Sequence, residues 1–365
     1  MPRLRPALQH IDPYRPGRPI SAVARELGIA PEDIVKLASN ESPLPPFPEV
    51  QEAISAATFE LNRYPDNDEH DLAEAVAARV GVEPDHLWFG GGSTELLSVM
   101  ANALGGPDTS AVYAWPAFII YRLASLQAGS RQIEVPLAEG HRHDLEAMAA
   151  AVADDTSVVF ICNPNNPTGT HVAAEAVSYF LGSIPEDVVV VIDEAYHEFV
   201  TASDYATAVP QVLQHPNLVV TRTFSKVYGL AALRLGYAVA DPELIKGFRR
   251  AQNPFTVNSL AQVGAIEALR HPGRVAERSR MITSGRDLIE KELTARGIER
   301  SDSQANFVYF RIGRDSEAAF REFLQRGVIV RPFEDGWLRV TVGTEEEDSK
   351  LLAALDDIVD HQPSV

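Results

Sequence analysis

The chain has 365 residues, 45% of them hydrophobic and 23% charged, which is the composition of a globular protein with one large and one smaller domain. Its formal net charge of −19 excludes a general nucleic-acid or anionic-membrane surface, so any phosphate must be bound by a local pocket. Cys162 is the single cysteine, which excludes an intrachain disulfide. The sequence contains neither a signal peptide nor an apolar run of about 20 residues, and we expect a cytoplasmic protein.

The first part of the chain is rich in proline and arginine and predicts an extended N-terminal arm over residues 1–36, with a short helix at Ser21–Leu27. A second cluster of prolines, between Pro43 and Pro48, leads into a helical pattern at Glu49–Thr58.

Short β-branched runs then alternate with helical patterns. Val158–Ile161, Val188–Ile192 and Leu218–Thr221 are expected to be buried strands, with helices at Asp144–Ala153 and Ala174–Leu181 between them. This alternation is typical of βαβ units. It predicts an α/β fold in which a large domain, residues 37–245, has a mostly parallel sheet flanked by helices.

Beyond residue 245 the regular alternation of strand and helix patterns ends, and residues 246–365 are predicted to form a smaller α+β domain. Its expected elements are helices at Val275–Arg296, Ser316–Arg326 and Glu345–Val359 and strands at Asn306–Arg311 and Leu338–Val342.

Polar side chains follow three successive strands of the predicted sheet. They belong to the segments Asn163–Gly169, Asp193–Tyr196 and Thr221–Lys226. Because ligands collect outside the carboxyl ends of parallel strands, we expect these side chains to share one site. Lys226 lies among small and apolar residues, where loss of hydration lowers the pKa of an amine and leaves it able to form a Schiff base with a carbonyl.

Four segments of the chain resemble those of fold-type I pyridoxal-phosphate aminotransferases: Asn166-Pro167-Thr168-Gly169, Asp193-Glu194-Ala195-Tyr196, Ser225-Lys226-x-x-Gly229-Leu230 and Arg234-x-Gly236. Within that family, further segments are most similar to histidinol-phosphate aminotransferases: Pro13-Tyr14, Leu37–Pro43, Asn62–Asp66, Gly92–Glu95 and Leu338–Gly343. The resemblance implies a large cofactor-binding domain, a smaller α+β domain and an N-terminal arm.

The resemblance also implies that pyridoxal 5'-phosphate (PLP) is the cofactor and that no metal is needed. Lys226 would hold PLP as a Schiff base and later move a proton between substrate and cofactor. Asp193 would keep the pyridine nitrogen protonated, and Asn166 and Tyr196 would hydrogen-bond the 3′ oxygen of the ring. The other implied cofactor-binding residues are Ser93, Thr94, Phe118, Thr223, Ser225, Arg234 and, from the neighbouring subunit of a homodimer with shared active sites, Tyr64.

For the substrate, the resemblance implies that Arg339 grips the α-carboxylate, since its planar guanidinium suits bidentate recognition. Tyr14 and Arg331 would meet a distal phosphate, with Asn306 nearby. The chain departs from the pattern of its relatives at four positions, which are Pro45, Gly91, Phe118 and Ala232.

These residues predict an aminotransferase that moves an amino group between L-glutamate/2-oxoglutarate and histidinol phosphate/imidazole-acetol phosphate, in histidine biosynthesis. An aromatic amino acid aminotransferase and a PLP decarboxylase or lyase of the same fold share the motifs and stay open as alternatives. A dinucleotide site is disfavoured, because the glycines at residues 90–92 do not continue as G-x-G-x-x-G. His141 and His143 have no metal-ligand spacing and are expected to lie in a solvated loop.

Overall fold

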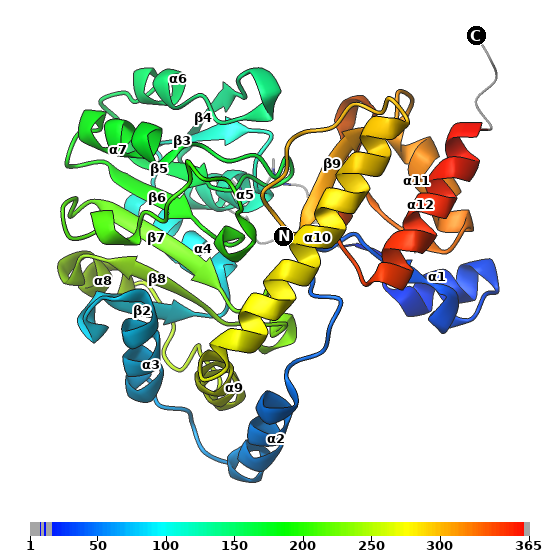
Figure 1. Cartoon of the computed structure of the whole chain (residues 1–365). Coiled ribbons are helices and arrows are strands. Elements are labelled where there is room, and N and C mark those ends of the chain that lie inside the picture. The colour runs from blue at the N-terminus through cyan, green and yellow to red at the C-terminus, as the bar shows by residue number, and fades with distance from the viewer. Residues whose placement is uncertain (1–7, 9–10, 12–16, 361–365) are drawn as a thin grey trace, which may run out of the picture.

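The computed structural model describes residues 8, 11 and 17–360. Among these residues a seven-stranded sheet with the order β2-β8-β7-β6-β5-β3-β4 forms the centre of the molecule (Figure 1). The strands β3 to β7 run parallel, while β8 is antiparallel to both β7 and β2. The seven strands are β2 (Leu87–Gly90), β3 (Ser110–Trp115), β4 (Arg131–Pro136), β5 (Thr156–Cys162), β6 (Val189–Asp193), β7 (Leu218–Thr223) and β8 (Gly236–Ala240).

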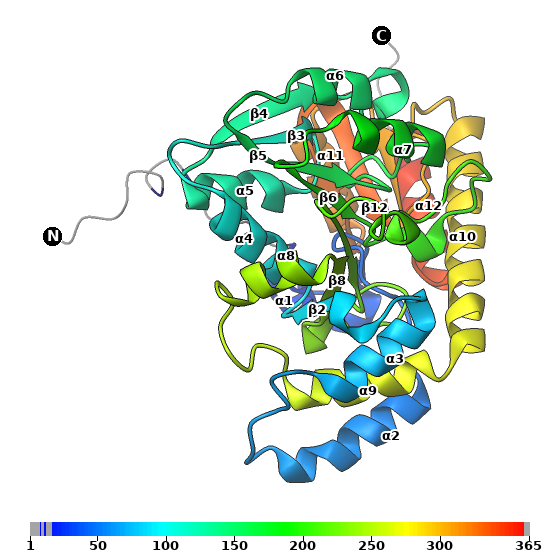
Figure 2. The same cartoon turned by 90° about the vertical axis from the view of Figure 1, so that its left-hand side faces the viewer.

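Both faces of this sheet are covered, because successive side chains of its central strands point to opposite sides and both sets are apolar. In β6, Val190 and Ile192 pack into one core cluster and Val189 and Val191 into another. The second cluster includes side chains of α4, α5 and α8, which Figure 2 shows together on one side of the sheet, with α10 (Pro272–Ala295) on the other side. Helices of the large sheet are α3 (His70–Val80), α4 (Ser93–Leu104), α5 (Ile119–Ala128), α6 (Leu145–Ala150), α7 (Ala174–Ser183) and α8 (Pro242–Arg249).

A second layer of strands follows the long helix α10 (Pro272–Ala295), which crosses from the large sheet to the small one (Figure 1). Here β11 (Arg331–Pro332), β12 (Trp337–Thr341) and β9 (Phe307–Arg311) form an antiparallel sheet in that order. A short parallel pair, β1 (Val35–Lys36) and β10 (Val328–Ile329), lies apart from it. The helices α11 (Ser316–Gln325) and α12 (Glu345–Asp360) complete this part.

Helices of one predicted part of the chain pack against another part. Helix α1 (Ile20–Leu27), which belongs to the predicted arm, packs through Val23 against Leu324 and Ile329 of the small domain. Helix α9 (Ser259–Leu269), which belongs to the predicted small domain, contacts α2 (Pro48–Ala57) and α3. The division into an arm (1–36), a large domain (37–245) and a small domain (246–365) therefore stays a prediction.

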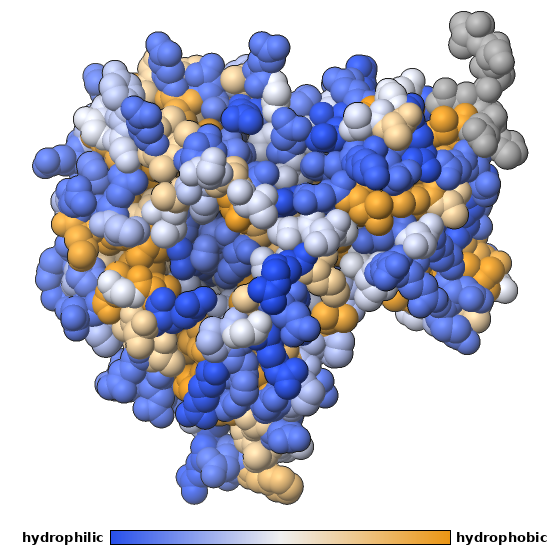
Figure 3. Space-filling model, in the orientation of Figure 1, coloured by the Kyte–Doolittle hydropathy of each residue, from blue (hydrophilic) through white to orange (hydrophobic). Residues whose placement is uncertain are grey.

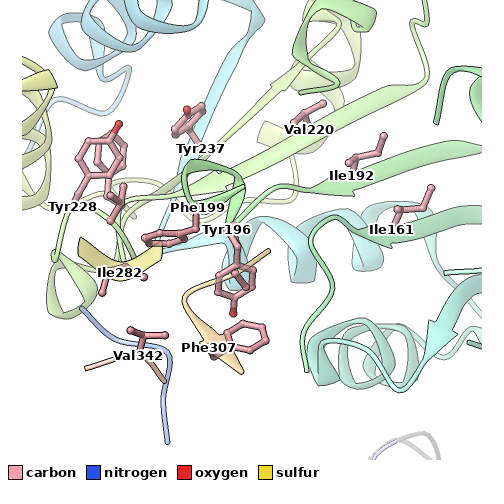
Figure 4. Packing of buried hydrophobic residues seen from close by; sticks show 14 of the residues in the cluster. Ile161, Ile192, Tyr196, Phe199, Val220, Tyr228, Tyr237, Ile282, Phe307 and Val342 are labelled. Atoms are coloured by element: carbon pink, nitrogen blue, oxygen red, sulfur yellow. The ribbon is translucent and has the colours of Figure 1, made fainter. Parts of the chain in front are cut away.

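Figure 4 shows where the two sheets meet in the core. Tyr196, which follows β6, lies edge-on to Phe307 of β9 with 5.1 Å between ring centroids, and Ile282 of α10 lies close to Phe199. One continuous apolar cluster thus includes residues of both sheets and of α10. Burial of this kind fixes how the small sheet sits beside the carboxyl ends of the large one.

The predicted α/β class with a mostly parallel sheet is confirmed. Each strand and helix expected from the sequence is present, with ends shifted by a few residues. Within residues 17–360, no helix is long and apolar enough to cross a membrane.

Candidate active site

A cavity of about 1240 Å³ lies between the carboxyl ends of β5, β6 and β7 and the small sheet. Polar residues from both sheets line it. The side chains that follow β5, β6 and β7 share this one cavity, as the sequence predicted. Of the predicted site residues, Ser93, Thr94, Phe118, Asn166, Asp193, Tyr196, Thr223, Ser225, Lys226, Arg234, Arg331 and Arg339 line this cavity.

Lys226 lies in the loop that follows β7, and its side chain is mostly buried. Its Nζ lies 5.6 Å from the ring centroid of Tyr196, and within the described residues it makes no hydrogen bond or ion pair. Burial is the main reason, followed by the nearby positive charge of Arg339, why the pKa of Lys226 falls from 10.5 to about 8. About a tenth of the amine is therefore unprotonated at pH 7, far more than for an ordinary lysine, and this form can react with a carbonyl.

Asp193 ends β6 and is 1% exposed. Its Oδ2 accepts a hydrogen bond from the Tyr121 hydroxyl (2.9 Å), and its Oδ1 accepts from the Thr221 hydroxyl (3.2 Å) and the Ala195 amide (3.2 Å). Burial raises the pKa of Asp193 from 3.8 to about 6, although these hydrogen bonds lower it. A buried, ionised carboxylate is energetically unfavourable, and a cation in the cavity would stabilise it by pairing with it.

The Tyr196 hydroxyl and Arg339 connect the two sheets through the segment that precedes α2. Asn40 donates from Nδ2 to the Tyr196 hydroxyl (3.1 Å). Arg339, on β12, donates from Nη1 to Asn166 Oδ1 and from Nη2 to the Ala38 carbonyl (2.8 Å). The guanidinium group is thus held in place beside the cavity before any substrate binds.

The turn before α4 is shaped to receive an anion. The first amides of α4 point out of the helix at Ser93 and Thr94, where the helix dipole favours negative charge. A Cβ on Gly92 would lie 2.5 Å from Arg234 Nη2, and one on Gly236 would lie 2.4 Å from the Ser93 amide nitrogen. Glycine at both positions keeps the amides and the guanidinium close together.

The hydroxyls of Thr223 and Ser225 lie next to this turn. Thr223 Oγ1 and Ser225 Oγ are hydrogen-bonded at 2.9 Å, and both residues line the cavity. Phe118 lies at the start of α5, with its ring edge-on to Tyr121 at 5.8 Å. Since Tyr121 also bonds Asp193, the aromatic side of the cavity and the buried carboxylate are fixed together.

Arg331 and Arg339 are direct cross-strand partners of β11 and β12, so two arginines share one edge of the cavity. Asn306 lies behind this edge. It does not line the cavity, and its Nδ2 donates to the Asn40 carbonyl (3.2 Å). Tyr14 lies outside the described residues.

Tyr64 is 82% exposed and stacks on Phe255, with 4.7 Å between ring centroids. It does not line the cavity of its own chain. Phe59 and Leu61, a few residues earlier, are also exposed. Figure 3 shows hydrophobic colour at the lower tip of the molecule, where Figure 1 places α2.

The prediction of a solvated loop for His141 and His143 is wrong. His141 lines the cavity, with its ring edge-on to Trp337 at 4.5 Å, and its carbonyl accepts a hydrogen bond from the Thr170 hydroxyl (2.6 Å). His143 is buried, which lowers its pKa to about 4. The sequence did not identify Tyr121 or Asn40 as residues that bond the proposed site residues Asp193 and Tyr196. Only Asn40 carried a sequence signal, because it lies in the segment Leu37–Pro43.

Glu194 has a structural role in the core, although it follows Asp193 directly. Its carboxylate accepts from Arg222 Nη2 (2.9 Å) and from the Ala208 amide (2.7 Å), and both charged side chains are buried. Replacing Arg222 with methionine is expected to lower the free energy of unfolding by about 3–5 kcal/mol, because an unpaired carboxylate is left inside. Urea unfolding measures this. The exposed pair of Arg131 and Asp155 is the control, and Arg131→Met should cost less than about 1 kcal/mol.

The sequence profile of the family described as Aminotransferase class I and II matches residues 32–355. The chain belongs to this family. The aminotransferase is 43% identical to a histidinol-phosphate aminotransferase of Moorella thermoacetica, over 98% of this chain and 94% of that protein. It is 45% identical to histidinol-phosphate aminotransferase 1 of Cupriavidus pinatubonensis, over 95% and 94% of the two chains.

Among solved structures, the aminotransferase resembles histidinol-phosphate aminotransferase from Sinorhizobium meliloti in complex with pyridoxal-5'-phosphate. The TM-score is 0.90, with 28% identity over 99% of this chain and 98% of that one. The predicted family, fold type and enzyme class are thereby confirmed.

Proposed function

We propose that this aminotransferase uses PLP to move an amino group between L-glutamate/2-oxoglutarate and histidinol phosphate/imidazole-acetol phosphate, in histidine biosynthesis and in the cytoplasm. Its relatives carry the name of this reaction. The structural observation that supports it is the cross-strand pair of Arg331 and Arg339. Both guanidinium groups line one edge of the cavity, where they suit a substrate that carries two negative charges. A phosphate monoester or a dicarboxylate supplies two negative charges, whereas an aromatic amino acid supplies one.

The side chains of the cavity fit PLP. The glycine turn, Ser93, Thr94, Thr223, Ser225 and Arg234 would hold its phosphate, and Phe118 would lie on its ring. Asp193 would meet the ring nitrogen, Asn166 and Tyr196 the 3′ oxygen, and Lys226 the aldehyde carbon. When bound, PLP supplies an electron-accepting ring that stabilises negative charge on the substrate Cα.

The chain's own residues would divide the remaining work. Lys226 would take the proton from the substrate Cα in one direction of the reaction and give a proton back to Cα in the other direction. A pKa of about 8 suits both steps. Arg339 and Arg331 hold the acidic groups of the substrate so that the Cα proton faces Lys226. The buried carboxylate of Asp193 keeps a positive charge on the ring nitrogen.

Substrate comparison tests the proposal. With glutamate as donor, kcat/KM for imidazole-acetol phosphate should exceed that for phenylpyruvate by about 10- to 100-fold, because phenylpyruvate has one negative charge where the phosphate monoester has two and so loses one charge-assisted contact. Equal values would support an aromatic amino acid aminotransferase. Release of carbon dioxide from an amino acid would support a decarboxylase.

Replacing Arg331 with glutamine should raise KM for imidazole-acetol phosphate by about 30- to 100-fold, since one hydrogen bond between charged groups is lost. KM for phenylpyruvate should change less than about threefold. Steady-state kinetics with both substrates measures this. Arg311→Gln, which removes a half-exposed arginine from β9, is the matched control and should change neither KM.

We also propose a homodimer in which Tyr64 reaches the PLP phosphate of the neighbouring subunit. Tyr64 is exposed among apolar side chains and lies outside its own cavity, as a residue that acts on a partner would. Tyr64→Phe should weaken PLP binding about tenfold through loss of one hydrogen bond.

Subunit mixing tests whether Tyr64 acts across an interface. Heterodimers of Lys226→Ala and Tyr64→Phe subunits should contain one site with both wild-type side chains. Titration with PLP should then reveal one site of wild-type affinity in each heterodimer. A monomer in sedimentation, or unchanged affinity in Tyr64→Phe, would exclude this role.

A further inference from the structure

Arg278 of α10 is a buried arginine without a buried acid to match it. It is 4% exposed, and no carboxylate of the described residues lies within ion-pair distance. Its Nη1 instead donates to the Val227 carbonyl (3.1 Å) and its Nη2 to the Pro45 carbonyl (2.6 Å). The guanidinium group also lies over the ring of Phe47, 4.5 Å from the centroid. Two carbonyls and one aromatic ring compensate only in part for the hydration that a buried guanidinium loses. Burial accordingly lowers the pKa of Arg278.

The first of these carbonyls belongs to the residue after Lys226. The loop admits the guanidinium only because residue 229 is glycine, since a Cβ there would lie 2.6 Å from Arg278 Nη1. Gly229 also has a φ of 72°, a conformation that other residues rarely adopt. The loop that carries Lys226 is therefore built around Arg278.

The second carbonyl belongs to a segment that reaches the substrate side of the cavity. Seven residues before Pro45, the Ala38 carbonyl accepts a hydrogen bond from Arg339. Asn40, in the same segment, bonds the Tyr196 hydroxyl. Arg278 is thus hydrogen-bonded both to the loop of Lys226 and to the segment that holds Arg339.

We propose that Arg278 is a positioning residue, which fixes the Lys226 loop relative to the 38–47 segment and so aligns the reactive amine with the substrate bound at Arg339. The inference rests on the proposed function for the role of Lys226. Arg278 touches neither the amine nor the cavity and acts through the backbone.

The first measurement uses cofactor-free protein, so it does not depend on turnover. The reactivity of Lys226 toward an amine-specific reagent is followed against pH by peptide mapping. The charged groups that face Lys226 are Arg339, Glu41, Arg234 and Asp193, and all stay unchanged in the variants. In Arg278→Met the loop should loosen and admit water. The pH at which Lys226 is half-reactive, its labelling midpoint, should then rise by at least about half a pH unit toward 10.5.

The second measurement uses the PLP-loaded enzyme. In Arg278→Met the rate of the glutamate half-reaction should fall about 10- to 100-fold, with KM for glutamate changed less than about threefold, because a displaced amine slows proton transfer. Arg278→Ala leaves a cavity in which a free guanidinium ion fits. Millimolar guanidinium should therefore restore the labelling midpoint of Lys226, whereas sodium chloride at the same concentration should not.

The matched control is Arg274→Met, one turn earlier on α10. Arg274 also approaches Phe47 (6.0 Å), but it is half-exposed and pairs with Glu49. It should leave both the midpoint and the rate unchanged. The proposal is overturned if Arg278→Met lowers only the melting temperature, or if Arg274→Met has the same effects. Should Arg278→Met fail to fold, Arg278→Lys, which can bond one carbonyl, must give an intermediate midpoint. A wild-type midpoint there overturns the proposal too.

Discussion

Replacing Lys226 with alanine will slow transamination by at least about 10⁴-fold, while the fold and PLP binding through the phosphate cradle are kept. Both the covalent hold on the cofactor and the proton carrier at the substrate Cα are lost with this one amine. Stopped-flow absorbance of the half-reaction with glutamate measures the rate. Borohydride reduction followed by peptide mapping should attach the cofactor to Lys226 in the wild type and to no peptide in the variant.

Lys246→Ala is the control, because Lys246 is exposed and its ion pair is with Glu243 on the surface. It should react at the wild-type rate. If borohydride fixed PLP to Lys246, or to another of the five lysines, the assignment of Lys226 would be wrong.

The same amine has a measurable effect on the stability of the cofactor-free protein. The pKa of Lys226 is lower in the folded protein (about 8) than the ordinary 10.5. The stability that this difference contributes is therefore present above pH 10.5 and lost as the pH falls through 8. At pH 7 a Lys226→Met variant should be more stable than the wild type, by up to about 3 kcal/mol, and the advantage should vanish near pH 11. Calorimetry of both proteins across this range measures it.

Replacing Asp193 with asparagine is expected to lower kcat by about 10³-fold, with a much smaller effect on KM. Asparagine keeps the shape, but its single acceptor oxygen can accept from either Tyr121 or Thr221 and not from both. Under the proposed function, its neutral amide also cannot hold a proton on the ring nitrogen. The developing charge at the substrate Cα then loses its electrostatic support, which is usually the largest single contribution to catalysis.

Half-reaction rates with glutamate measure the effect of Asp193→Asn. Asp155→Asn, which removes an exposed carboxylate that pairs with Arg131, should leave the rate within about twofold of wild type. A rate for Asp193→Asn within tenfold of wild type would show that this carboxylate does not hold the ring nitrogen cationic.

Strands β5, β6 and β7 could be predicted because each is a run of β-branched residues buried on both faces, which is a local signal. The residues at their ends followed from the same runs, since parallel strands finish at one edge. Lys226 and Asp193 were therefore found from sequence, and both line the cavity.

Features that depend on distant partners could not be predicted. β2 lies in the sheet only by pairing with β8, about 150 residues later. His141 reaches the cavity because its loop is bonded to Thr170, and Arg278 is buried because two remote carbonyls accept from it. Neither His141 nor Arg278 differs locally from a surface residue on a loop or helix.

The small antiparallel sheet contributes Arg331 and Arg339, while the residues proposed to bind the cofactor within the same subunit come from the large sheet and the segments that follow its strands. Under the proposed function, the residues that bind the cofactor and the two arginines that bind the substrate therefore belong to different segments of the chain. A gene segment for the β11–β12 hairpin could be exchanged among relatives to redirect the enzyme toward other acids. Such a chimera would keep Lys226 and Asp193, and it would need a residue at position 339 that still bonds Asn166.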